Sequence, residues 1–168
     1  SSEEPYERSF GIEVLDHAVG SADLSRLHNG APLLVNHDPN DQIGVVENAR
    51  VDDDKVGRAT VRFGKSERAQ EIFGDVSDGI RRLVSVGYQV KQVDKAERDK
   101  DGLATYRVSS WQPLEISLVA VPADPSVGVG RSADSEDNQP LEVKTSTEES
   151  KMEENNSITV DASPRIEI

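Results

Sequence analysis

The sequence predicts one mostly β domain with flanking helices, arranged as an antiparallel barrel or sandwich. About six or seven segments between residues 6 and 130 show the alternation and the turn signals that are typical of strands. One longer segment among them has helical spacing instead. Consecutive strands interrupted by a single long helix favour a barrel or sandwich with its helices outside.

The first elements are short. Residues 10–14 alternate apolar and polar side chains, which predicts a strand. Residues 23–27 favour a helical turn that ends at Asn29-Gly30. The apolar residues 32–35 predict another strand, and the polar residues 36–41 that follow predict a turn.

The middle of the chain combines a hairpin and a helix. Residues 43–51 and 56–63 predict two strands joined at the three aspartates 52–54. In residues 66–80 the apolar side chains recur with helical spacing, and Ser66 is a good N-cap. This segment is therefore the predicted long helix.

Three further strands are predicted before two prolines close the domain. They cover residues 83–90, 103–108 and 111–121, and the charged residues 94–102 form a loop between the first two.

Composition excludes several functions. The net charge of −13 argues against nucleic acid or an anionic membrane as a partner, because phosphate binding needs a positive surface. There is no cysteine, which excludes disulfides and thiolate chemistry. No apolar run approaches the roughly 20 residues of a transmembrane helix, and no paired histidines have zinc-ligand spacing. We therefore expect no cofactor and no metal.

Composition changes near residue 131. Residues 131–168 hold ten acidic and four basic residues without a sustained period, which predicts a mostly disordered acidic tail. Its apolar patches at 158–160 and 166–168 are either strands added to another surface, docking points, or parts of a plain solvated tail. The expected domains are thus 1–130 and the tail 131–168.

Three residues are candidates for catalysis. Ser85 and Gly87 share one face of a predicted strand, where the missing side chain leaves room for a substrate backbone to approach the hydroxyl. Glu115 interrupts an apolar strand, so its carboxylate needs water or a partner such as histidine. His37 lies where an apolar run meets a turn, the best placed of the three histidines for a base near a cleft.

Each of these residues also has a structural interpretation. Ser85 is equally explained as a small residue packed under the helix, and Glu115 as a solvated side chain on an outer sheet face. A lone histidine is commonly a surface or core residue.

Taken together, the segments resemble the tailed-phage prohead proteases, with similarity over residues 6–130. The segments that carry the resemblance are Arg8–Gly11, Pro32–Asp38, Val76–Ile80, Val84–Tyr88, Leu114–Val119 and Pro122–Pro125.

The resemblance implies a fold and a set of catalytic residues. The fold is an antiparallel β-barrel wrapped by helices, related to herpesvirus assemblin. The nucleophile corresponds to Ser85 and the base to His37. The third member is expected on the strand 111–121, where Glu115 can orient the imidazole. Asp38 is the second choice, and a bare Ser–His dyad is the remaining alternative.

The resemblance also implies a function. A prohead protease is a serine endopeptidase that acts inside the immature capsid, in the host bacterial cytoplasm. It cleaves scaffold, the N-terminal segment of the major capsid protein, and itself. A weak homodimer is expected from the assemblins. The alternatives are a non-catalytic capsid assembly module that retains the fold, and an unrelated β-barrel binding module whose Ser85, His37 and Glu115 lie far apart.

Overall fold

The computed structural model describes residues 1–94, 97–98, 103–123, 128–129 and 164–168. The elements in chain order are β1 (Tyr6–Arg8), β2 (Gly11–Leu15), α1 (Ser25–His28), β3 (Pro32–Val35), β4 (Asp38–Val51), β5 (Gly57–Phe63), α2 (Glu67–Ser77), β6 (Val84–Gln92), β7 (Glu97–Arg98), β8 (Ala104–Val108), β9 (Ser110–Leu118) and β10 (Arg165–Glu167). The mostly β class with two short helices is confirmed.

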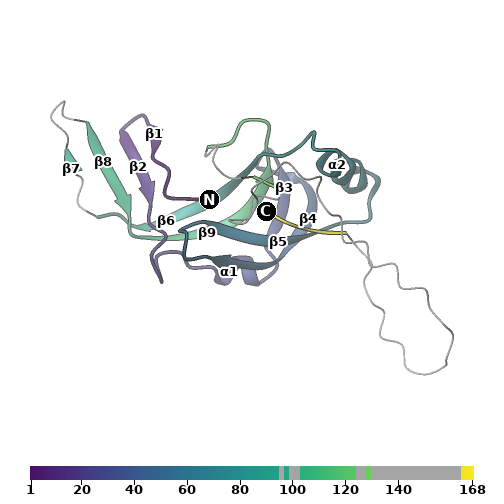
Figure 1. The fold of residues 1–168 in the computed structure, drawn as a ribbon, viewed down its shortest axis with the longest axis horizontal. Coiled ribbons are helices and arrows are strands. Elements are labelled where there is room, and N and C mark those ends of the chain that lie inside the picture. The colour runs from purple at the N-terminus through teal and green to yellow at the C-terminus, as the bar shows by residue number, and fades with distance from the viewer. Residues whose placement is uncertain (95–96, 99–102, 124–127, 130–163) are drawn as a thin grey trace, which may run out of the picture.

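The strands form two hydrogen-bonded sheets. The larger has the order β10-β5-β4-β3-β9-β6, and the smaller has the order β1-β2-β8-β7. Figure 1 shows the smaller sheet at one end of the molecule and α2 at the other. The pairs β3–β9 and β2–β8 are parallel, whereas the other named pairs are antiparallel. Pairings among the described strands do not close a ring, so the barrel stays a prediction.

The core joins the larger sheet to α2. Leu33, Ile43 and Phe63 of β3, β4 and β5 are at most 1% exposed. The helix buries Ala69, Ile72 and Val76 against them, the spacing that places apolar side chains on one helical face. Its N-cap is the predicted Ser66, whose hydroxyl accepts a hydrogen bond from the backbone N–H of Ala69 at 3.2 Å.

The turn predicted at residues 36–41 is much shorter in the structure. Only Asn36 and His37 form it, both with positive φ (52° and 59°), and β4 begins at Asp38. Val35 pairs with Asp38, so the connection is a two-residue hairpin loop with the left-handed backbone that such loops require. β4 therefore begins at Asp38, the partner of Val35, and residues 39–41 form an irregularity in this strand before Leu34 pairs with Gln42.

The end of the chain belongs to the larger sheet. β10 pairs antiparallel with β5, which agrees with an added strand at the second apolar patch of the tail. The first patch, 158–160, lies outside the described residues. Of the helices that the structure describes, none has the length and apolarity needed to cross a membrane.

Candidate active site

Three adjacent strands of the larger sheet bring the predicted residues together. β9 lies between β3 and β6. Ser85 of β6 pairs with Ser117 of β9, and Gly87 pairs with Glu115. Residues directly opposite in an antiparallel pair point to the same face, so these four residues share one face.

His37 joins this face from the turn after β3. β3 runs parallel to β9, with Leu34 opposite Ser117 and Val35 opposite Leu118. The backbone N–H of Asn36 then donates to the carbonyl of Leu118 at 2.9 Å. The tight turn therefore starts beside β9, and it places His37 over Glu115 and Ser117.

The Glu115 carboxylate is shared between an imidazole and a hydroxyl. Its Oε1 lies 2.6 Å from Nδ1 of His37, and its Oε2 accepts a 2.7 Å hydrogen bond from the Ser117 hydroxyl. The Ser117 oxygen in turn accepts from the backbone N–H of His37 at 3.1 Å. The side chain of Glu115 is 14% exposed and that of His37 is 43% exposed. The carboxylate is thus fixed from both sides, while the ring edge remains open to solvent.

Gly87 has a different role from the one that the sequence suggested. A Cβ built on Gly87 would lie 2.1 Å from Oε1 of Glu115. The space above Gly87 is therefore filled by the Glu115 carboxylate, and not left for a substrate backbone. A side chain at position 87 would collide with the atom that binds His37.

Ser117 is the functional residue that sequence reasoning missed. It is fully buried, and it follows Glu115 by two residues on the same strand face. That spacing was the available signal, because i and i+2 share a face in a strand.

Ser85 and His37 line one cleft of about 600 Å³. Within the described part of the chain, no hydrogen bond joins the Ser85 hydroxyl to the imidazole. Nucleophile and base are often further apart in substrate-free structures than in complexes. A second, mostly apolar cavity of about 390 Å³ is also lined by Ser85.

A polar cluster of Arg8, Glu13 and Tyr88 also lines this cleft. Glu13 is buried, accepts a 3.0 Å hydrogen bond from Arg8, and is also bonded by the Tyr88 hydroxyl. Burial, and then the hydrogen bond to Glu13, raise the pKa of Tyr88 to about 12. Tyr88 therefore stays a neutral donor at neutral pH and fixes β2 of the smaller sheet against β6.

The alternative third residue, Asp38, has its carboxylate engaged by its neighbour Asn40. The Oδ1 atom of Asp38 accepts from the backbone and the side-chain amide of Asn40, at 2.8 and 3.0 Å. The other histidines lie elsewhere: His17 is buried, and His28 contacts the carbonyl of Ala49 at 2.7 Å. The residues that the structure describes contain no acidic and histidine cluster suited to a metal ion.

Comparison with known proteins points to a single family. The model described as "Caudovirus prohead serine protease" matches residues 4–140. The "Major capsid protein" of Halomonas phage phiHAP-1 is 54% identical over 137 residues, which cover 80% of this chain and 23% of that protein. The chain thus spans about a quarter of the length of this relative. No solved structure matches.

Proposed function

The chain belongs to the caudovirus prohead serine protease family, and on that premise we propose that it is a serine endopeptidase with Ser85, His37 and Glu115 as its catalytic triad. The observation that carries this proposal is the 2.6 Å contact between His37 and Glu115 at the edge of a cleft that Ser85 also lines. A carboxylate bonded to Nδ1 selects the tautomer in which Nε2 has the lone pair.

The mechanism follows from these roles. Nε2 of His37 takes the proton of the Ser85 hydroxyl as its oxygen attacks the peptide carbonyl. Glu115 stabilises the imidazolium that forms. The ring then gives the proton to the leaving amine, and an acyl-enzyme remains on Ser85. Water, activated by the same nitrogen, releases the acyl group and restores the serine.

The substrates we propose are capsid and scaffold proteins inside the prohead. The support is the match to a protein named major capsid protein, in which the similar region is about a quarter of the length. In that relative the similar region and the rest of a protein named major capsid protein share one polypeptide, which makes capsid protein the first substrate to test. Residues 1–130 form the protease domain in this proposal, and the acidic residues 131–168 are a segment open to self-cleavage.

A serine-directed probe tests the nucleophile. The full chain is incubated with a fluorophosphonate, alone and with capsid protein, and the modified residue is found by peptide mass spectrometry. We expect an adduct on Ser85 that is absent from Ser85→Ala. Ser77→Ala is the matched control, because the Ser77 hydroxyl only donates to the carbonyl of Phe73 within α2.

Two results would count against the proposal. An adduct on another serine would contradict the assignment of Ser85. Absence of any adduct under both conditions would favour a non-catalytic assembly module that has kept the protease fold.

A further inference from the structure

One edge of β5 is paired with β4, and its other edge is paired with the short segment 164–168. The backbone of Ile168 exchanges two hydrogen bonds with Ala59, at 2.6 and 2.7 Å. The N–H of Phe63 donates to the carbonyl of Pro164 at 2.9 Å. An exposed sheet edge can pair with an extended peptide. Residues 164–168 pair in this way with residues 59–63 of β5.

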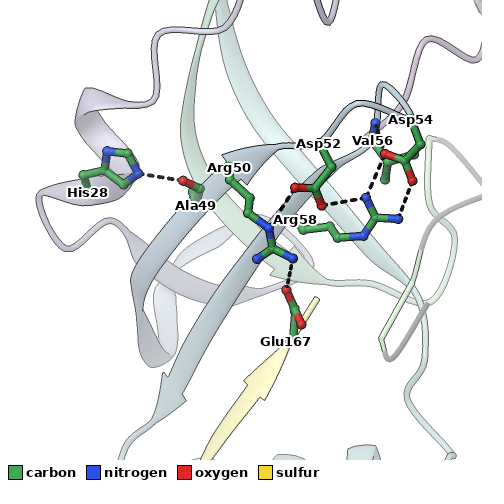
Figure 2. Close-up of polar contacts among 8 residues, drawn as sticks. All are labelled: His28, Ala49, Arg50, Asp52, Asp54, Val56, Arg58 and Glu167. Atoms are coloured by element: carbon green, nitrogen blue, oxygen red, sulfur yellow. Dashed lines mark hydrogen bonds and ion pairs between the residues drawn. The ribbon is translucent and has the colours of Figure 1, made fainter. Parts of the chain in front are cut away.

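The side chains of this segment alternate in a way that fits the surface beneath. Ile166 and Ile168 pack against the core cluster. Nε of Arg165 lies 2.7 Å from Glu47, and the Glu167 carboxylate lies 2.6 Å from Arg50. Figure 2 shows Arg50 between Glu167 and Asp52, which orients the guanidinium toward the added strand.

This arrangement selects one register. A slip of two residues in either direction would separate Arg165 from Glu47 and Glu167 from Arg50. A slip of one residue would turn both isoleucines away from the core. The surface therefore distinguishes a basic–apolar–acidic–apolar peptide from other peptides of the same length.

We propose that the β5 edge is a docking site for an extended peptide of this alternating pattern, occupied by residues 164–168 of the same chain. Val129 is the last described residue before the tail, and it is buried and bonded to the carbonyl of Arg82. Given the proposed protease function, a cut between residues 130 and 163 leaves its distal product bound to the domain through residues 164–168.

Because residues 164–168 are covalently linked to the domain, even so short a segment can stay bound to β5. Three residue pairs and two surface ion pairs give little affinity by themselves. A linker on the same chain raises the local concentration of the segment to about the millimolar range. A free peptide with the same pattern therefore binds the β5 edge weakly, and the tethered segment 164–168 outcompetes it.

Amide hydrogen exchange on the full chain tests this docking. The variant Arg165→Glu/Glu167→Arg exchanges the two charges without changing composition or net charge. Ile166→Asp removes an apolar contact. All measurements use a Ser85→Ala background, so the tail stays intact and the result is independent of peptidase activity.

We expect the amides of Ala59 and Phe63 to exchange about tenfold faster in both variants, since they lose the strand that protects them. The amide of Val119, which donates to the carbonyl of Leu83, serves as an internal reference and should not change. Val19→Asp is the control for adding a carboxylate, because Val19 is fully exposed.

Three outcomes would overturn the proposal. Unchanged exchange at Ala59 and Phe63 would show that the segment does not occupy the edge. Faster exchange at Val119 as well would mark β10 as an integral strand of the fold. Protection that falls on dilution would show that a second copy supplies the segment.

Discussion

Two histidines in this molecule have opposite environments. His17 is 1% exposed, with Nδ1 2.9 Å from the carbonyl of Leu15 and Nε2 3.0 Å from the hydroxyl of Ser1. His37 is at a turn with an exposed ring, and its Nδ1 faces the Glu115 carboxylate. No hydrogen bond in the described part of the chain engages Nε2 of His37.

This difference supports His37 rather than His17 as the proposed base. Each histidine lies close to a serine, but both ring nitrogens of His17 make hydrogen-bonding contacts inside the protein. Burial lowers the pKa of His17, so this ring is kept neutral as a structural group. His37 instead has a carboxylate that can balance a positive charge and a nitrogen that can reach a substrate.

Replacement of each histidine by glutamine should separate catalysis from stability. His37→Gln should lower the rate of peptide cleavage by about 10⁴-fold or more, because the base is lost. The rate of His17→Gln should be close to that of the native chain, but its free energy of unfolding should fall by about 1–3 kcal/mol. Cleavage assays and urea unfolding measure the two effects. A large loss of rate in His17→Gln under folded conditions would contradict the distinction.

Two glycine-to-alanine variants test the fit around Glu115. Gly87→Ala should reduce cleavage by about 10²-fold or more, since the new Cβ displaces the carboxylate from His37. Gly74→Ala is the control: it lies in α2, and an added Cβ would meet nothing within 4 Å. That variant should keep full activity and gain about 0.5–1 kcal/mol of stability. Equal activities for the two variants would argue against a catalytic Glu115.

The buried histidine should make stability depend on pH. Because burial lowers the pKa of His17 from its ordinary value of 6.5, the unfolded chain takes up the proton first during acidification. Its contribution is therefore complete above about pH 6.5 and is lost as the pH falls toward the folded pKa. Urea unfolding between pH 8 and pH 5 should show a steeper loss for the native chain than for His17→Gln. If the free energy of unfolding fell with pH equally in both proteins, His17 would not be the source of the pH dependence.

Tyr88 should give the smallest effect. Its pKa is raised to about 12 by burial and by Glu13, so its ionisation during an ultraviolet pH titration should come about two units later than the ordinary value of 10. Tyr88→Phe should remove that late step and cost about 1–2 kcal/mol, because the buried Glu13 loses a donor. A titration curve that is the same in Tyr88→Phe would contradict the cluster as described.

Much of this arrangement could be anticipated from local patterns. The Ser66 cap and the apolar spacing predicted α2, and turn residues predicted the hairpin of β4 and β5. The pattern of residues marked Glu115 as a carboxylate in need of water or a partner, and the family resemblance paired it with His37. Ser85 was named from its place beside Gly87 and from the same resemblance, and its catalytic role remains a proposal.

The remainder depends on long-range pairing. β4 begins at Asp38, in a segment whose residues favour a turn, because Val35 of β3 pairs with Asp38 across the two-residue loop. Gly87 was interpreted as space for substrate, since only the register with β9 shows that Glu115 fills it. Ser117 gained its role from the same register. The docking of residues 164–168 depends on an edge that lies more than a hundred residues away in the sequence.

The most direct test of the catalytic assignment is intact mass over several days at high protein concentration, with and without capsid protein. The native chain should cut within residues 131–168 or within the added capsid protein. Ser85→Ala should yield no product and Glu115→Gln should yield it much more slowly. The same fragments appearing at the native rate in Ser85→Ala would contradict the account.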